Sequence, residues 1–126
     1  MVCTVLVVDD VDAVRSVLRR GLEKDGHHVL EAADGREALR ILARESVQVV
    51  VTDILMPELD GIEVITQMRS DYPEIGVIAI SAPSNEMYLK MAKTLGAHRT
   101  LEKPFALSEI KQAVNELAAR PGATSA

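Results

Sequence analysis

Short apolar runs alternate along the chain with longer stretches in which apolar positions recur every three or four residues. The short runs lie at residues 3–9, 28–32, 47–52 and 75–80, with Thr100-Leu101 as a shorter fifth run. Runs of this length are typical of strands that are buried on both faces of a sheet. The longer stretches have the period of amphipathic helices. The pattern therefore predicts five strands, each followed by a helix.

Each predicted helix has one inner apolar face, and most have a start or stop signal. The expected inner residues are Val14, Val17, Leu18 and Leu22; Ala38, Leu39, Ile41 and Leu42; Val64, Ile65 and Met68; Met87, Met91, Ala92 and Leu95; and Ile110, Ala113, Val114, Leu117 and Ala118. The start signals are the pairs Asp34/Glu37 and Asp60/Glu63, together with Ser84 and Ser108, and the stop signals include Gly26 and Gly96.

Strict alternation of strands and helices predicts an α/β fold with a parallel sheet and helices on both faces. The chain has 126 residues, whereas a closed barrel needs about 250, so we expect an open doubly wound sheet. Residues 1–120 form one domain in this interpretation, and 121–126 form a short polar tail. No second domain follows in the sequence, so we expect either a stand-alone domain or one excised from a longer chain.

Composition narrows the function classes further. The formal net charge is −5, which argues against direct nucleic-acid binding. The basic residues Arg15, Arg19, Arg20 and Lys24 have helical spacing, and we interpret them as a solvated helix face. Cys3 is the only cysteine, which excludes a disulfide framework. Because the sequence has neither a signal peptide nor an apolar run of about 18 residues, we expect a cytoplasmic protein without membrane insertion.

The candidate chemistry lies where the predicted strands end. Asp9 and Asp10 end the first strand, Asp53 the third, Ser81 the fourth, and Lys103 follows the fifth. In an open parallel sheet, ligands bind beyond the carboxyl ends of the strands. Crowded carboxylates need a counter-charge, and Mg²⁺ with oxygen ligands can supply it. A metal ion, a lysine and a hydroxyl around Asp53 suit transfer of a phosphoryl group to that carboxylate, which would act as the nucleophile.

Four stretches in this order and spacing resemble the receiver domains of two-component response regulators. They are VLVVDD at 5–10, DILMPELDG at 53–61, ISA at 80–82 and LEKPF at 101–105. The resemblance implies a flavodoxin-like sheet with strand order 2-1-3-4-5 and five helices. It also implies a cis bond between Lys103 and Pro104.

The resemblance assigns a role to each candidate residue. Asp53 would be the phosphoacceptor, Lys103 and Ser81 would contact the phosphoryl group, and the carboxylates Asp9, Asp10 and Asp53 would hold Mg²⁺ with the backbone carbonyl of Leu55. The implied protein is a signalling switch in a phosphorelay rather than an enzyme, although it would promote its own Mg²⁺-dependent phosphorylation.

The partners follow from the same resemblance. A histidine kinase or histidine phosphotransfer protein would donate the phosphoryl group. A downstream target or a second copy of the chain would bind the face made by the fourth helix, fifth strand and fifth helix.

The sequence departs from the family pattern at a few positions. Thr100 stands where the family usually has an aromatic residue that turns inward, and Tyr88 is a candidate substitute, although a half-exposed surface tyrosine is the alternative. Leu55 and Pro83 are apolar at positions that tune hydrolysis in the family, so we expect slow dephosphorylation. Asp12 follows the acidic pair after one residue, and we interpret it as a helix cap.

Other interpretations remain open at this point. An aspartyl-phosphate hydrolase would need a second acid two residues after Asp53, where Leu55 stands. A nucleotide- or flavin-binding domain would need a phosphate-binding loop after the first strand, where Asp9 and Asp10 stand instead. A pseudo-receiver that only binds partners is the third alternative.

Several other residues are expected to have structural roles only. The histidines His27, His28 and His98 lack metal-ligand spacing and are expected at the surface. Cys3 is expected to be a small strand residue, and Met87 and Met91 are expected to lie in or near the core.

Overall fold

The computed structural model describes residues 2–54, 61–82 and 86–119, and five strands alternate there with five helices. The strands are β1 (Thr4–Val8), β2 (His28–Ala32), β3 (Val49–Asp53), β4 (Gly76–Ser81) and β5 (Arg99–Glu102). The helices are α1 (Asp12–Lys24), α2 (Gly35–Arg44), α3 (Gly61–Asp71), α4 (Glu86–Leu95) and α5 (Leu107–Ala119). The predicted order of elements is confirmed.

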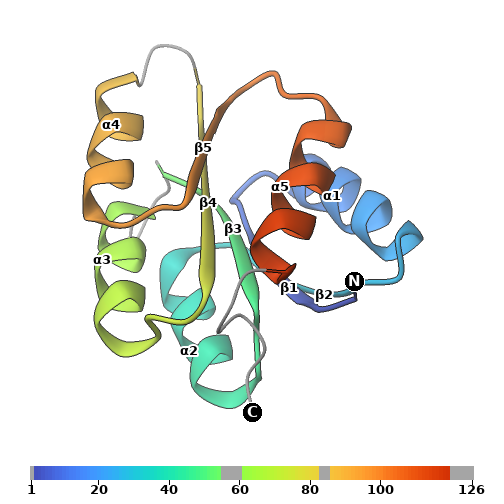
Figure 1. Ribbon diagram of the computed structural model, residues 1–126, viewed down its shortest axis with the longest axis horizontal. Coiled ribbons are helices and arrows are strands. Elements are labelled where there is room, and N and C mark those ends of the chain that lie inside the picture. The colour runs from blue at the N-terminus through green and yellow to red at the C-terminus, as the bar shows by residue number, and fades with distance from the viewer. Residues whose placement is uncertain (1, 55–60, 83–85, 120–126) are drawn as a thin grey trace.

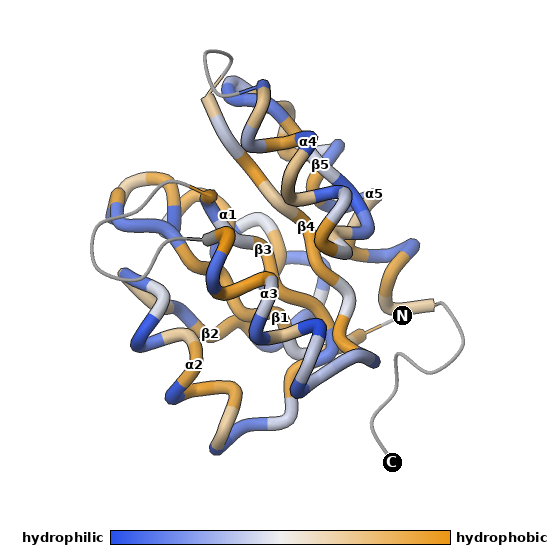
Figure 2. Tube along the Cα trace, turned by 90° about the vertical axis from the view of Figure 1, so that its left-hand side faces the viewer, coloured by the Kyte–Doolittle hydropathy of each residue, from blue (hydrophilic) through white to orange (hydrophobic). Residues whose placement is uncertain are grey.

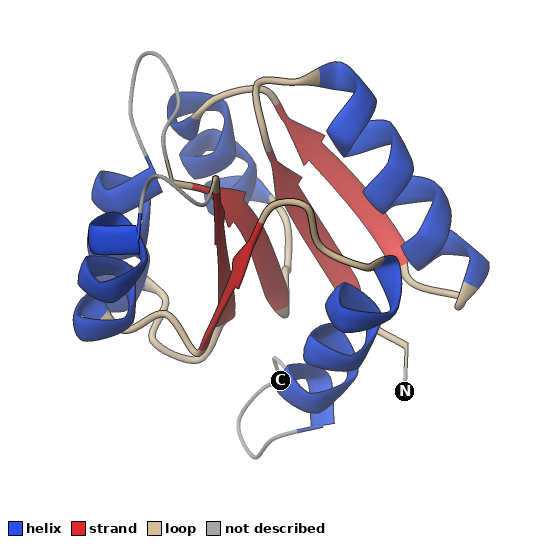
Figure 3. Cartoon of the chain, turned by 90° about the horizontal axis from the view of Figure 1, so that it is seen from above, coloured by secondary structure: helices blue, strands red, loops and turns tan. Residues whose placement is uncertain are grey.

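The five strands form one parallel sheet in the order β2-β1-β3-β4-β5, as the resemblance implies. Helices α1 and α5 cover one face of the sheet, and α2, α3 and α4 cover the other (Figure 1). The same three layers are visible from above in Figure 3. Parallel pairing between neighbouring strands requires crossover connections, and the helices supply them.

The central strands are rich in valine and isoleucine because both of their faces are covered. Every residue of β3 and β4 is buried, and β1 is buried after Thr4. Two separate hydrophobic clusters result, one on each side of the sheet. The helices alternate between hydrophobic and hydrophilic residues along their length (Figure 2), as expected for elements with only one covered side. Within the described ranges, no helix combines the length and apolar character needed to span a membrane.

The helix-boundary signals are confirmed in part. The Asp34 carboxylate accepts a hydrogen bond from the Glu37 amide at 2.9 Å. Gly26 and Gly96 have φ angles of +92° and +120°, a backbone conformation that favours glycine and ends a helix. Asp60 and Ser84 lie outside the described residues.

Two capping predictions are wrong. Asp12 is the first residue of α1, the N-cap residue is Val11, and no side chain caps it; the Asp12 carboxylate pairs instead with Arg15. Helix α5 begins at Leu107, before Ser108. The Glu109 carboxylate accepts from the amide of Ala106 at 2.9 Å, so an acid of the first turn holds this helix start.

The inner faces predicted for α3 and α5 are confirmed, and that of α2 is confirmed except that Leu39 is half-buried, but predictions of burial on α1 and α4 are wrong. Val17 on α1 is 56% exposed, and on α4 the exposed fractions of Met87, Met91 and Leu95 are 74%, 43% and 36%. Leu89 and Ala92 are the buried residues of α4. Helix α4 has apolar residues on two sides, and only the side of Leu89 and Ala92 packs on the protein.

The histidines were predicted at the surface, and His27 contradicts this prediction. Its side chain is 4% exposed, and its Nδ1 accepts a hydrogen bond from the Cys3 amide at 3.1 Å. His28, the next residue, is exposed, as expected when successive residues point to opposite sides. His98 is half-buried, and its Nδ1 accepts from the Val77 amide at 3.0 Å. His27 and His98 therefore serve as acceptors for backbone amides at the amino ends of strands.

Candidate functional site

Strand register brings the predicted site residues to one edge of the sheet. Val8 of β1 pairs with Thr52 of β3, and Asp53 pairs with Ile80 of β4. The residues after each strand remain anchored, because the amides of Asp9, Ile54 and Lys103 donate to carbonyls of neighbouring strands at 2.8–3.1 Å. The side chains at this edge are therefore carried by a backbone that the sheet holds firmly.

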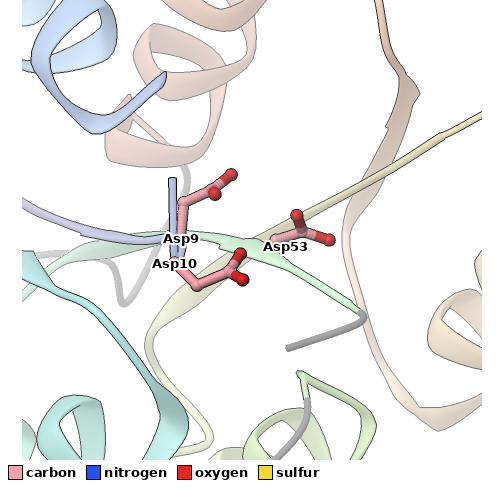
Figure 4. Close-up of side chains that lie close together, drawn as sticks. All are labelled: Asp9, Asp10 and Asp53. Carbon is pink, nitrogen blue, oxygen red and sulfur yellow. The ribbon is translucent and has the colours of Figure 1, made fainter. Parts of the chain in front are cut away.

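Three carboxylates converge there. One oxygen from each of Asp9, Asp10 and Asp53 lies within 4.8 Å of the others, and Figure 4 shows the three side chains lying close together. Asp9 is 2% and Asp53 is 8% exposed, whereas Asp10 is exposed. Oxygen donors grouped in this way suit a hard divalent cation with water on its open side.

Lys103 links two of the acids. Its Nζ donates to Asp53 Oδ2 at 2.9 Å and to Asp9 Oδ2 at 3.2 Å. Burial works against a charge on Lys103, but its hydrogen bond to Asp53 and the charges of Asp53 and Asp9 outweigh this effect and raise the pKa of the amine. The lysine is therefore a fixed cation at neutral pH.

For Asp9, in contrast to Lys103, burial outweighs the effect of the charged and hydrogen-bonding partners on the pKa. Loss of solvent raises the pKa of its carboxyl, although the Val11 amide, which donates to Oδ1 at 2.9 Å, and Lys103 both favour the ionised form. The nearby charge of Asp53 raises this pKa further. One ammonium cannot neutralise three ionised carboxylates, so the site favours the binding of additional positive charge.

Ser81 ends β4 and is completely buried. Its Oγ has no hydrogen-bond partner among the described residues. A buried hydroxyl without a partner costs free energy, and an anionic oxygen bound at this edge could accept its hydrogen. The predicted residues Asp9, Asp10, Asp53 and Lys103 are thus brought together, with Ser81 on the neighbouring strand end.

Other predicted features of the site have mixed outcomes. The cis bond between Lys103 and Pro104 is confirmed. Leu55 and Pro83 lie outside the described residues, so their expected roles stay predictions. Thr100 is half-buried, and Tyr88 is 39% exposed on α4, in agreement with the alternative of a half-exposed surface tyrosine.

The sequence interpretation missed two features next to the acids. Arg15 was assigned to a solvated helix face, but its side chain is only 13% exposed, and its Nη1 donates to the backbone carbonyl of Asp9 at 2.5 Å. An apolar pocket of about 360 Å³ also adjoins the site and includes Lys103 itself. Its lining residues are Ala13, Val14, Val17, Lys103, Pro104 and Phe105. Val17, which is exposed, is one of the residues that line this pocket.

Comparisons with known proteins agree with the geometry. Residues 5–115 match the family model of the response regulator receiver domain. The chain is 42% identical over 106 residues to the response regulator MprA of Mycolicibacterium vanbaalenii, covering 84% of this chain and 46% of that protein. It is 34% identical over 116 residues to the alkaline phosphatase synthesis transcriptional regulatory protein PhoP of Bacillus subtilis, covering 92% and 48%.

Solved structures give the same result. The chemotaxis response regulator CheY4 of Vibrio cholerae matches with a TM-score of 0.84 and 28% identity over 93% of this chain and 99% of that one. A response regulator receiver domain protein from Clostridium thermocellum matches with a TM-score of 0.87 and 30% identity, covering 91% and 93%. The chain spans about half the length of the curated relatives it matches. It belongs to the receiver domain family of two-component response regulators.

Proposed function

We propose that the chain is a phosphorylation-dependent switch in which Asp53 accepts a phosphoryl group from a phosphohistidine of a partner protein. The observation that carries this proposal is the convergence of three carboxylates around one lysine that bonds to both Asp53 and Asp9. Three carboxylates that share one ammonium leave like charge uncompensated, and such crowding is typical of functional sites. The proposed donor is a histidine kinase or a histidine phosphotransfer protein.

The transfer is a displacement at phosphorus. A carboxylate oxygen of Asp53 forms a bond to phosphorus while the bond from phosphorus to the imidazole nitrogen breaks, and that nitrogen keeps the electron pair. Lys103, which keeps its proton, donates to an oxygen of the arriving phosphoryl group, and Ser81 can donate its unpaired hydroxyl to another. Asp9, Asp10 and Asp53, with the carbonyl of Leu55, would hold Mg²⁺, which supplies the positive charge that the phosphoryl oxygens need.

Two surfaces support the signalling role. The apolar pocket between α1 and Pro104-Phe105 adjoins Lys103, and apolar side chains of a phosphodonor protein could enter it beside the site. On α4, Met87, Met91 and Leu95 are exposed at successive turns, and apolar side chains on an exposed helix are typical of a binding surface. We propose that the α4–β5–α5 face binds the downstream target or a second copy of the chain.

The proposal is tested by phosphorylation with phosphoramidate, whose phosphorus–nitrogen bond resembles that of phosphohistidine. The native chain should gain one hydroxylamine-sensitive phosphoryl group by intact mass when Mg²⁺ is present, and far less when EDTA is present. Asp53→Asn should gain none, because an amide is a poor nucleophile.

Three outcomes would contradict the proposal in different ways. Equal modification of both chains would exclude Asp53 as the acceptor. No modification of the native chain would favour a receiver that only binds partners. Equal modification with Mg²⁺ and with EDTA would exclude the proposed metal requirement.

A further inference from the structure

Asp10 differs from the other two acids in how it is held. Asp9 and Asp53 are buried, whereas Asp10 is exposed and follows the end of β1. Packing therefore does not fix the Asp10 carboxylate, although this carboxylate belongs to the cluster. Its position depends on the orientation of the peptide group that joins it to Asp9.

Arg15 binds that peptide group. Its Nη1 donates to the Asp9 carbonyl at 2.5 Å, and its Nε donates to Glu31 Oε1 on β2 at 3.2 Å. A third contact joins Nη2 to the Asp12 carboxylate. Because the guanidinium is planar and its donors have a fixed geometry, these contacts together set the position of the Asp9 carbonyl.

The peptide bond is planar, with its carbonyl and amide pointing in opposite directions. A donor that fixes the Asp9 carbonyl therefore also fixes the Asp10 amide and the Cα from which the Asp10 side chain projects. The other polar atoms of Asp9 are already held: its amide donates to Ala32, and its carboxylate accepts from Val11 and Lys103. The carbonyl lies beyond the paired residues of β1, and Arg15 supplies its donor.

We propose that Arg15 is a positioning residue for the metal site, which holds the Asp9–Asp10 peptide so that the exposed Asp10 carboxylate stays in the cluster. This inference rests on the proposed function, because it assumes that the cluster binds Mg²⁺. Arg15 acts through the backbone of Asp9 and does not itself bind the ion.

The charge of Arg15 and its positioning role predict opposite changes in Mg²⁺ affinity when Arg15 is removed. Arg15 is a cation close to a cation site, so its removal should strengthen Mg²⁺ binding if only its charge mattered. If Arg15 holds the Asp9–Asp10 peptide, its removal should weaken binding, because partners that orient metal ligands typically change affinity by about 10- to 100-fold. The sign of the change therefore decides between the two effects.

The test compares Arg15→Met with Arg19→Met. Arg19 lies one turn further along α1 and pairs with Glu31 at 2.7 Å and Glu23 at 3.1 Å. This control therefore removes an equal charge and breaks a contact with Glu31, the partner that Arg19 shares with Arg15. By calorimetric titration of the metal-free protein, the dissociation constant for Mg²⁺ should rise about tenfold in Arg15→Met and stay unchanged or fall in Arg19→Met. At saturating Mg²⁺, the control Arg19→Met should be phosphorylated at nearly the native rate.

A second readout needs no metal. In EDTA, the backbone amide resonance of Asp10 should shift in Arg15→Met and stay in place in Arg19→Met.

An unchanged or lower dissociation constant for Mg²⁺ in folded Arg15→Met would overturn the inference. If that variant does not fold, Arg15→Lys replaces it and should also bind Mg²⁺ more weakly than the native chain, since an ammonium lacks the planar fork of donors with fixed directions that the guanidinium presents to the Asp9 carbonyl and Glu31; native affinity would overturn the inference. Absence of Mg²⁺ binding by the native chain would instead contradict the proposed metal site.

Discussion

The two edges of the sheet use polar side chains in different ways. At the amino edge, defined here by Cys3, His27, Gln48 and His98, neutral side chains accept hydrogen bonds from strand amides. Gln48 Oε1 accepts from Thr4 at 2.7 Å, and the Nδ1 atoms of His27 and His98 accept from Cys3 and Val77. At the carboxyl edge, defined by Asp9, Asp10, Asp53, Ser81 and Lys103, charged groups gather around one another.

Burial has the same direct effect at both edges but a different consequence. It raises the pKa of the Cys3 thiol and of the Asp9 carboxyl. The thiol is neutral at pH 7 in any case, so burying it does not remove a charge from water. A carboxylate that is ionised at neutral pH is destabilised by the same burial. The amino edge is therefore a stabilising end of the fold, and the carboxyl edge carries an electrostatic cost that binding of a cation can offset.

The largest effect should come from the lysine of the carboxyl edge. Lys103→Met keeps most of the apolar stem but removes the cation that bonds to Asp53 and Asp9. Phosphorylation by phosphoramidate should slow by about 100-fold or more, the usual loss when one donor to a reacting oxyanion is removed. The rate is measured by intact mass at saturating Mg²⁺.

Gln48→Ala is the matched change at the amino edge. It should lower the free energy of unfolding by about 1 kcal/mol, the usual net contribution of one hydrogen bond, and leave the phosphorylation rate close to native. Similar losses of rate in both variants would show that the two edges do not differ in function.

The fold and most of the carboxyl edge could be predicted because a parallel sheet gathers the ends of its strands at one side. Once the runs ending at Asp9, Asp53 and Ser81 are taken as parallel strands, their proximity follows from topology alone. The role of Arg15 could not be predicted in this way. Its contact with the Asp9 carbonyl depends on how the chain turns between β1 and α1, and apolar periodicity carries no information about that turn.

Helix α4 shows a second limit. Met87, Met91 and Leu95 lie four residues apart, so the period correctly indicates that they share one side of a helix. Leu89 and Ala92 form another apolar side of the same helix, and it is this side that is buried. Periodicity shows which residues lie together, but it does not show which of two apolar sides packs on the sheet.

The next prediction concerns the electrostatic cost at the carboxyl edge. The pKa of Asp9 is raised from its ordinary value of 3.8, so the folded state holds this proton more strongly than the unfolded state does. The resulting stability is present below the unfolded pKa and is lost as pH rises through the folded pKa. In EDTA, Asp9→Asn should therefore be more stable than the native chain at neutral pH, and the difference should shrink as pH falls toward the ordinary carboxyl pKa of 3.8.

Urea unfolding across this pH range measures the difference, and Asp34→Asn is the control. Asp34 caps α2, and asparagine caps a helix about as well as aspartate, so the control should stay near native stability. Mg²⁺ should stabilise the native chain and have little effect on Asp9→Asn. A native chain that is as stable as Asp9→Asn at neutral pH without metal would contradict the proposed cost.

The smallest effect is expected for the alkylation rate of Cys3 when Asp53 is phosphorylated. This measurement tests whether the two edges are independent. Because burial raises the pKa of its thiol and only the thiolate is nucleophilic, iodoacetamide should modify the folded chain more slowly than the urea-unfolded chain at mildly alkaline pH. Phosphorylation of Asp53 should leave the rate for the folded chain unchanged, since Cys3 and Asp53 lie at opposite ends of the sheet. A rate that changes on phosphorylation would show that the switch reaches the amino edge, and the two edges would then have to be treated as coupled.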